Sequence, residues 1–275
     1  MWGPGLVLSL SGCSLAVDAG REQCSSDGDC ARLGPVFEGS ACLDSLCGTR
    51  PDPAWACLDE AVAVAPLNTP RQIRFTARLV DVVFQTPVPN IELRVCERLD
   101  AECQMPIASS VSDQAGEVVL TLAGGFTGYL RWQSPDTQPV LFFFNAPFIE
   151  DSVVTLGVVS ARIMEGFDAQ FEGQIVQDRA VVVVYAQNCS GEPAAGVRVG
   201  ALEGDASTRA FYEADGLFPP AQAETAGTGV ARIINVPTGN VSITGTLSNG
   251  REMGISRVLT RTGFATLTIL SPQPR

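Results

Sequence analysis

The chain of 275 residues is long enough for two domains of about 100 residues, and its 45% apolar content can fill real cores. Its net charge of −12, from 18 basic and 30 acidic side chains, disfavours nucleic acid as a partner, because an acidic surface repels phosphate. The absence of histidine removes Ser-His-Asp and Cys-His catalysis and most catalytic zinc sites. We therefore expect a protein that is not an enzyme and needs no cofactor.

A short apolar run near the start ends at a cysteine. The residues LSGC at 10–13 resemble a bacterial lipobox, in which an aliphatic residue and two small residues precede the lipidated cysteine. The resemblance implies that 1–13 is a lipoprotein signal peptide, that Cys13 carries the lipid, and that Ser14 directs the protein to an outer membrane, facing the periplasm or the exterior. Residues 1–5 (MWGPG) depart from the pattern because they carry no basic side chain. An ordinary secretory signal peptide and a chance match remain the alternatives.

Eight cysteines remain after Cys13, an even number that suits a compartment in which thiols are oxidised. Four of them form C-x5-C-x11-C-x4-C within 14–56, and this spacing favours a disulfide knob over a four-cysteine zinc site. The stretch SDGD, with Asp27 and Asp29, lacks the further ligands of a calcium loop, so we predict no metal site. We expect Cys24, Cys30, Cys42 and Cys47 to pair among themselves, and Cys96 and Cys103 to close a short polar loop by a local disulfide. Cys57 and Cys189 remain, and they are expected to bridge the linker and the second domain.

After a linker assigned to residues 57–70, two similar blocks follow each other at an offset of 106 residues. FTARLVDVVFQTPVPNIELRV (75–95) aligns with VVVVYAQNCSGEPAAGVRVGA (181–201), and VSDQAGEVVLTLAGGFTGYL (111–130) aligns with ETAGTGVARIINVPTGNVSI (224–243). Each block alternates apolar and polar residues between turn signals, which predicts two copies of one β-sandwich.

The alignment also predicts which side chains fill the second core, because Phe75 falls on Val181 and Ala77 falls on Val183. A copy with its own core residues is expected to fold alone, as a fragment of residues 178–275. The predicted core positions of this copy are Val181, Val183, Val197, Val199, Val230, Ile233, Val241 and Ile243.

The motifs GEPAAGVRV, TAGTGVARIINVPTGNVSI and RTGFATLTIL resemble the carboxypeptidase regulatory-like domain, a transthyretin-like seven-stranded β-sandwich. The resemblance assigns residues 71–158 and 178–271 to two such domains, joined by a connector at 159–177. The first copy departs from it, with AGGFTGY in place of P-x-G-x-Y. With the lipobox and the knob, the chain resembles myxobacterial-type surface lipoproteins. This implies an all-β fold with two tandem seven-stranded Ig/transthyretin-like β-sandwiches behind a disulfide-rich N-terminal segment, and no catalytic residues.

Three further groups of residues are considered as possible sites. The aromatic residues Tyr129, Trp132 and 142–144 are interpreted as core, with an exposed sugar-binding platform as the alternative. Residues 160–171 predict a short helix that joins the domains, and its apolar face, formed by Ile163, Phe167 and Phe171, is interpreted as packing. The acidic residues are expected to lie in solvated turns: Asp113, Asp136, Glu150 and Asp151.

These features predict a non-enzymatic, lipid-anchored cell-surface protein whose sandwiches serve display, adhesion or binding. The alternative is a carbohydrate-binding accessory module that uses exposed aromatic residues of the first sandwich, and exposure of Trp132 and Phe143 would favour it. The expected partners are a membrane, through the N-terminal lipid, and a surface protein or polysaccharide.

Overall fold

The computed structural model describes residues 22–48, 52–59, 71–144, 146–169, 171, 173–214 and 222–272. The chain divides into two compact units, Met1–Pro53 and Ala54–Arg275. The predicted signal peptide and Cys13 lie outside the described residues, as does most of the predicted linker. Within the described ranges, no helix has the length and apolar character needed to cross a bilayer.

The described part of the first unit is a small disulfide-bonded knob. Two disulfides, Cys24–Cys42 and Cys30–Cys47, join its helix to its hairpin. The sulfur atoms of Cys24, Cys30 and Cys47 lie within 4.8 Å of one another, but each belongs to a disulfide, so they are not thiolate ligands for zinc. The elements of the knob are α1 (Asp27–Arg32), the 3-10 turn η1 (Pro35–Phe37), β1 (Ala41–Leu43) and β2 (Leu46–Gly48).

Two aspartates of the knob, Asp27 and Asp29, hold its backbone in place. The Asp29 carboxylate accepts hydrogen bonds from the backbone N–H groups of Ser25 (3.0 Å) and Ser26 (2.8 Å) and from both hydroxyls. These bonds stabilise the ionised form and lower the pKa of Asp29 to about 2. Asp27 Oδ1 accepts the backbone N–H of Cys42 at 2.9 Å. Both carboxylates therefore have structural partners at the start of α1.

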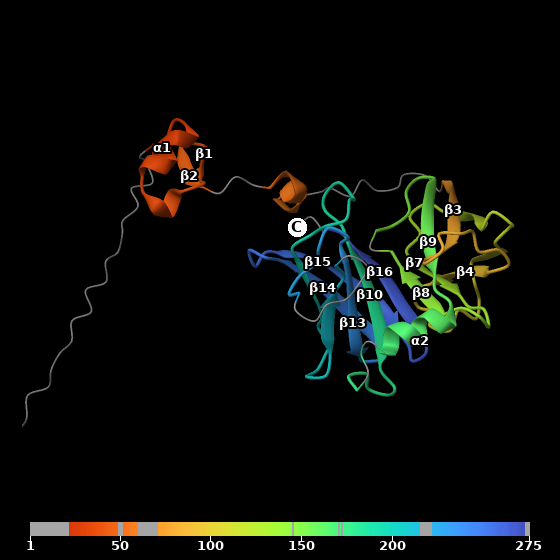
Figure 1. Ribbon diagram of the computed structural model, residues 1–275. Coiled ribbons are helices and arrows are strands. Elements are labelled where there is room, and N and C mark those ends of the chain that lie inside the picture. Colours follow the sequence, from red (N-terminus) through yellow and green to blue (C-terminus); the bar gives the residue numbers. More distant parts are fainter. Residues whose placement is uncertain are drawn as a thin grey trace, which may run out of the picture. The chain divides into compact units, whose positions relative to one another are not determined.

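The second unit contains two β-sandwiches that follow each other in the chain (Figure 1). The first has β3 (Gln72–Asp81), β4 (Glu92–Glu97), β5 (Ala108–Val111), β6 (Glu117–Ala123), β7 (Gly128–Trp132), β8 (Val140–Phe143) and β9 (Ser152–Val158). The second has β10 (Ala180–Ala186), β11 (Val197–Ala201), β12 (Arg209–Tyr212), β13 (Val230–Val236), β14 (Gly239–Leu247), β15 (Glu252–Thr260) and β16 (Ala265–Leu270). Each sandwich thus has seven strands within the described residues, which confirms the predicted fold class.

The sandwiches are joined edge to edge, which the sequence did not predict. Strand β16 pairs in parallel with β8, so that Leu267 lies opposite Phe142 and Thr268 opposite Phe143. The result is one eight-stranded sheet in the order β12-β13-β10-β16-β8-β7-β4-β5, covered by the three-stranded sheets β6-β3-β9 and β11-β14-β15. In Figure 1, β16 and β8 lie side by side at the centre of the unit.

The two three-stranded sheets cover opposite faces of the long sheet. Successive side chains of a strand point to opposite faces, and Phe142 belongs to the core under β6-β3-β9, whereas Phe143 belongs to the core under β11-β14-β15. Each half of the long sheet therefore has one face that its own sandwich does not cover. Short segments from elsewhere in the chain cover these two faces.

The outer face of the first half is covered by the loop between β4 and β5, which the Cys96–Cys103 disulfide closes. We call residues 97–103 the disulfide loop. Tyr129 is fully buried beneath it and donates a hydrogen bond from its hydroxyl to Asp100 O at 2.6 Å. On the second half, the predicted connector helix is present as α2 (Ala161–Ala169). It lies beside β13 and β10 in Figure 1, and Met164 and Phe171 contact Arg232 of β13.

A third segment packs against the core of the second sandwich. The 3-10 helix η2 (Pro53–Asp59) places Leu58 in this core and Trp55 against it. The Cys57–Cys189 disulfide holds η2 there, and Cys189 N–H donates to Ala54 O at 2.9 Å. This disulfide spans 132 residues, and a loop of that size contributes about 4–5 kcal/mol in the chain-entropy account. Residues before the second repeat are thus part of its core.

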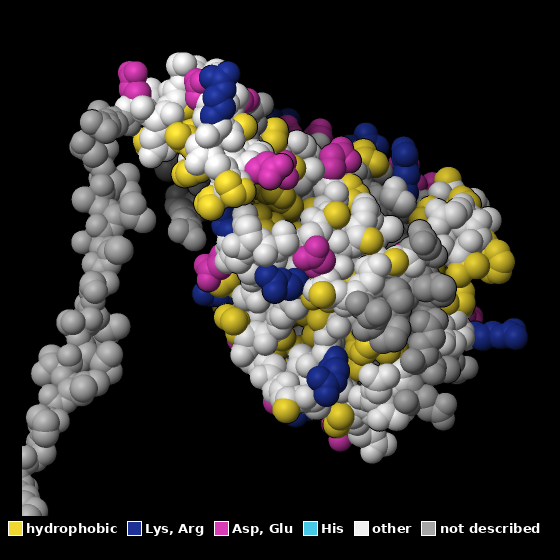
Figure 2. Space-filling view, turned by 60° about the vertical axis from the view of Figure 1, so that its left-hand side comes forward, with side chains coloured by type: hydrophobic (Ala, Val, Ile, Leu, Met, Phe, Trp, Pro, Cys, Tyr) yellow, Lys and Arg dark blue, Asp and Glu magenta, His cyan; other side chains and the backbone are white. Residues whose placement is uncertain are grey.

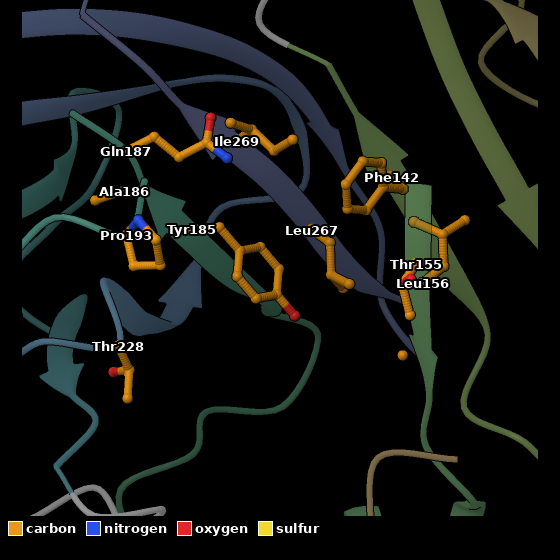
Figure 3. A pocket seen from close by; sticks show the side chains of 11 residues that line it. Phe142, Thr155, Leu156, Tyr185, Ala186, Gln187, Pro193, Thr228, Leu267 and Ile269 are labelled. Carbon is orange, nitrogen blue, oxygen red and sulfur yellow. The ribbon is translucent and has the colours of Figure 1, made fainter. Parts of the chain in front are cut away.

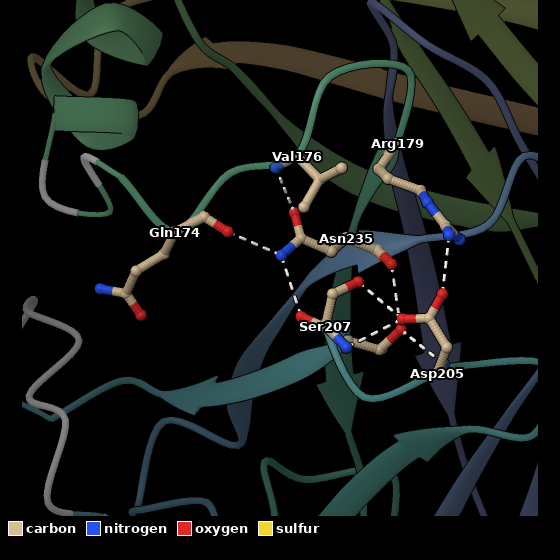
Figure 4. Close-up of polar contacts among 7 residues, drawn as sticks. Gln174, Val176, Arg179, Asp205, Ser207 and Asn235 are labelled. Carbon is tan, nitrogen blue, oxygen red and sulfur yellow. Dashed lines mark hydrogen bonds and ion pairs between the residues drawn. The ribbon is translucent and has the colours of Figure 1, made fainter.

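A buried asparagine fixes the connector that follows α2 (Figure 4). Asn235 donates through Nδ2 to Gln174 O at 2.7 Å and Ser207 O at 2.9 Å, and its Oδ1 accepts the N–H of Val176 at 2.8 Å. Its φ of 57° lies in the left-handed region, which asparagine tolerates better than most residues. One side chain therefore ties the connector to the loop between β11 and β12.

The two copies of the internal repeat pair their central strands in the same way. Strand β3 lies between antiparallel β6 and parallel β9, just as β10 lies between antiparallel β13 and parallel β16. Gly116 (φ 72°) and Gly229 (φ 66°) occupy matching turns, and a Cβ atom at either would lie 2.5 Å from a backbone oxygen. The copies differ in one strand, because β5 pairs with β4, whereas β12 pairs with β13 and so joins the other sheet.

The predicted register of β10 is wrong by one residue. Phe75 lies opposite Leu120, and it is Val182, not Val181, that lies opposite the equivalent Ile233. A shift of one residue exchanges the two faces of a strand. Val182 and Val184 are therefore buried under the three-stranded cover, while Val181 and Val183 are half-buried on the other face.

The loop after the strand explains the error. The segment from Leu79 to Pro87 is one residue longer than its counterpart from Ala186 to Pro193, so an ungapped alignment of the loops misplaces the strand. Of the other predicted core positions, Val230 is half-buried. The remaining ones are buried as predicted: Val197, Val199, Ile233, Val241 and Ile243.

Candidate binding pocket at the junction of the sandwiches

A pocket of ≈ 340 Å³ lies where the first sandwich meets the second. We call it the junction pocket. Its walls come from β9 and β8 on one side and from β10, β16 and the loop after β10 on the other. The side chains and backbone that line it belong to Phe142, Thr155, Leu156, Gly157, Tyr185, Ala186, Gln187, Pro193, Thr228, Leu267 and Ile269.

The pocket walls are mainly apolar (Figure 3). In Figure 3, Tyr185 and Leu267 of the second sandwich face Phe142 and Leu156 of the first. Strand β9 is an edge strand of its sheet, so one of its sides has no strand neighbour among the described residues. An apolar hollow beside an edge strand suits a group with apolar surface and hydrogen-bonding ability.

Tyr185 is the titratable residue that lines the junction pocket. Within the described part of the chain, its hydroxyl has no hydrogen-bond partner. Burial, with a smaller contribution from the charge of Glu213, raises the pKa of Tyr185 and keeps the phenol neutral. The pocket therefore presents a neutral hydroxyl that can donate or accept a hydrogen bond, and it presents no acid–base pair.

All three tyrosines of the sequence are expected to ionise at unusually high pH. Burial raises the pKa of Tyr129 to about 12, and burial also raises the pKa of Tyr185 and of Tyr212. An ultraviolet absorbance titration of the native protein should therefore show less phenolate at pH 10 than free tyrosine, whose pKa is about 10. The same protein in denaturant should titrate normally.

The same shift has a consequence for stability. Between the unfolded pKa of about 10 and the folded value of about 12 for Tyr129, the unfolded chain has lost a proton that the native state retains, so stability falls as pH rises. Denaturant unfolding over this range measures the loss, and Tyr129→Phe should make it smaller. Native tyrosines that form phenolate as readily as free tyrosine at pH 10 would contradict the buried placement of these residues.

The aromatic cluster of the first sandwich is core, as the sequence predicts. Trp132 and Phe143 are each only 1% exposed, and Tyr129 and 142–144 are buried with them. Phe142 faces one core and Phe143 the other, since they alternate along β8. The alternative of a sugar-binding platform made of these aromatic rings is therefore wrong.

The predicted acidic turn residues are exposed, and they do not come together in a site: Asp113, Asp136, Glu150 and Asp151. Asp113 accepts the N–H groups of Ala115 and Glu117 within its own turn, and Asp151 accepts the N–H of Arg74. Asp113 thus organises its own turn, and Asp151 binds the backbone of β3.

The sequence did not predict two exposed apolar side chains on the surface. Leu99 of the disulfide loop is 94% exposed, and Met105 lies exposed just beyond this loop. On the face of the molecule in Figure 2, acidic and basic side chains are scattered among apolar ones and form no patch of a single sign. Leu99 also borders a second pocket, which has charged residues in its lining.

No protein-family model matches the sequence, and no curated protein matches it significantly. Among solved structures, the chain is similar to the Bacillus anthracis TIE protein, at 10% identity over 74% of this chain and 34% of that chain, with a TM-score of 0.23. It is also similar to a minor pilin of Streptococcus agalactiae (12% identity, 74% and 98% coverage, TM-score 0.23) and to the shaft pilin SpaA of Lactobacillus rhamnosus GG (7% identity, 75% and 99% coverage, TM-score 0.24).

The chain thus spans about a third of the length of the first of these proteins. Likenesses at these scores carry no conclusion about function. The β-sandwich architecture rests on the strand pairing of the chain itself, and the carboxypeptidase regulatory-like family, which no family model supports, stays a prediction.

Proposed function

We propose that this is a non-enzymatic surface protein, anchored by a lipid on Cys13, whose paired sandwiches form a rigid body that holds binding surfaces away from the membrane. The observation that carries the proposal is the shared sheet across β16 and β8. Hydrogen bonding between two domains along a whole strand resists bending, because any hinge there would break backbone hydrogen bonds.

Contacts of the disulfide loop support the rigid body. Arg98 donates through Nη1 to Arg257 O of β15 at 2.8 Å, and Glu102 forms an ion pair with Arg261 of the second sandwich. The loop itself is closed by Cys96–Cys103. It therefore contacts the second sandwich on the face of the long sheet opposite to the junction pocket.

The chemistry of the chain supports a role in binding over catalysis. The sequence has neither histidine nor lysine, so all 18 of its basic side chains are arginines. Arginine stays protonated at physiological pH and serves poorly as a general base or amine nucleophile. Tyr185 in the junction pocket is likewise held neutral, and it lies without a paired carboxylate in the lining.

The finer features of the proposal come from the resemblances in the sequence. They are the outer-membrane address, membership of the carboxypeptidase regulatory-like family in both sandwiches, and a surface protein or polysaccharide as partner. The order of a lipid-anchored cysteine, a knob and then a stiff body suits display outside the cell.

Membrane fractionation of cells that express the full chain tests the anchor. Cys13→Ser should release the protein into the soluble fraction, because the apolar run before Cys13 is too short to span a bilayer. Ser14→Ala is the matched control and should leave the protein on the membrane, whereas Ser14→Asp should keep it on a membrane other than the outer one. Retention of the Cys13→Ser protein in the outer-membrane fraction would refute lipid anchoring.

A further inference from the structure

A second pocket, of ≈ 580 Å³, lies on the opposite face of the long sheet from the junction pocket. It lies between the disulfide loop and the β14–β15 hairpin, and we call it the loop–hairpin pocket. Its volume falls in the range of about 300–1,000 Å³ that accommodates small organic ligands. It is lined by Arg98, Leu99, Ala101, Phe143, Glu203, Asn240, Val241, Ser242, Arg257, Val258 and Leu259.

Two arginines line this pocket together. The Arg98 guanidinium lies over the ring of Phe143, 5.9 Å from its centre, and its Nη1 donates to the backbone oxygen of Arg257 at 2.8 Å. Burial, and then the like charge of Arg257, lowers the pKa of Arg98. The like charges of the two side chains repel each other, and an anion bound near both would relieve this repulsion.

Neither arginine has a carboxylate partner among the described residues: no acidic oxygen lies within 4.0 Å of Arg98 or Arg257. The sequence has 30 acidic side chains for 18 arginines, so acidic partners are abundant in the chain. Other arginines use them, as Arg179 does with Asp205 at 2.7 Å. The loop–hairpin pocket therefore presents positive charge that the described part of the chain does not neutralise.

The one acidic residue of the lining, Glu203, is hydrogen-bonded to another lining residue, Ser242. Glu203 accepts the backbone N–H of Ser242 at 2.7 Å and the hydroxyl of Ser242 at 3.0 Å. Although burial opposes ionisation, these hydrogen bonds outweigh it and lower the pKa of Glu203. An ionised carboxylate keeps further lone pairs that can accept hydroxyl groups, and the Asn240 amide beside it can both donate and accept.

We propose that the loop–hairpin pocket binds an acidic sugar unit of the uronic acid type. Arg98 and Arg257 take its carboxylate, since guanidinium groups match a carboxylate by paired hydrogen bonds. Glu203 and Asn240 take hydroxyl groups, and the exposed side chain of Leu99 contacts the apolar face of the ring. An inorganic phosphate suits the pocket less well, because it would leave most of the volume empty and Glu203 would repel its second charge.

This proposal names a ligand class for the proposed surface function and rests on that function only for its biological setting. Binding is a property of the pocket, whereas anchoring is a property of Cys13, so each can fail without the other. Loss of binding with normal fractionation would overturn the ligand, and normal binding with a protein that is not surface-bound would overturn the proposed location.

Calorimetric titration of the purified full chain tests the pocket with glucuronate, galacturonate and their short oligomers, with glucose, and with phosphate and sulfate. We expect the uronates to bind and glucose not to bind. Arg257→Gln should weaken uronate binding by about tenfold or more, because it removes a charge-assisted pair. Arg98→Gln should act in the same direction, and added salt should weaken binding by the wild-type protein.

Arg209→Gln is the matched control, since Arg209 is exposed on β12 and does not line the pocket. Its affinity for uronate should equal that of the unchanged protein, and far-ultraviolet spectra should show that all three variants are folded. The proposal is overturned if uronates do not bind, if Arg257→Gln binds them as well as the wild type, or if phosphate binds more tightly than any uronate.

Discussion

Replacing Val184 by aspartate is expected to abolish the folded state of the second unit at neutral pH. Val184 is fully buried in the core of the second sandwich, beneath β11-β14-β15. A carboxylate there has no partner, and burying an unpaired charge together with loss of the apolar contact costs about 5 kcal/mol or more, against a total stability of ~5–15 kcal/mol. Denaturant unfolding followed by near-ultraviolet circular dichroism measures the effect.

The matched control is Val153→Asp on β9. Val153 is 61% exposed, so its aspartate keeps its water and should change the free energy of unfolding by about 0.5 kcal/mol or less. The pair of variants also tests the register of the repeat. If Val184→Asp were tolerated as well as Val153→Asp, the assignment of Val182 and Val184 to the inner face would be wrong.

The second sandwich alone, residues 178–275, is expected to be unstable or to aggregate, although its sequence repeat predicts an independent domain. Cutting the chain there removes Leu58 from the core and leaves Cys189 without Cys57. It also strips β16 of its partner β8 and exposes an unpaired strand edge. The longer fragment Ala54–Arg275 corresponds to the whole compact unit and should melt in one cooperative transition.

Calorimetry and analytical ultracentrifugation of the two fragments distinguish these outcomes. A monomeric 178–275 fragment with the melting temperature of the longer fragment would show that the sandwiches are independent, and the shared sheet would then add nothing to stability. Two separate transitions in Ala54–Arg275 would contradict the single body on which the proposed display function depends. A single transition that Cys57→Ser moves to lower temperature would agree with η2 as part of the core.

Local patterns were sufficient for much of this fold. Alternation of apolar and polar residues predicts strands because the side chains of a strand alternate with period two, and the predicted strands at 75–79 and 118–122 are β3 and β6. Matching glycines at 116 and 229 predict matching turns because both backbones need positive φ. The pairing of Cys96 with Cys103 follows from a short polar loop between them, and the structure contains this bond.

Which side chains of a strand point into the core is harder to predict from sequence than the presence of the strand. In β10, the four consecutive valines at 181–184 fit either register, so only the alignment with the first copy could choose between the faces. That alignment failed because one residue is missing from the loop after the strand. The pairing of β10 with β13 and the burial of Val182 and Val184 decided the question.

By itself, the sequence determined that the chain is all-β, that it repeats one sandwich, that it has no histidine chemistry, and which cysteines lie close enough along the chain to bond. Only the tertiary structure decided the joining of β16 to β8 and the two pockets on opposite faces of the joined sheet. The reason is distance along the chain: the Thr268 hydroxyl donates to Phe143 O across 125 residues, and Arg98 reaches Arg257 across 159. Periodicity and turn signals describe neighbours in sequence, whereas these contacts depend on how two finished sandwiches meet.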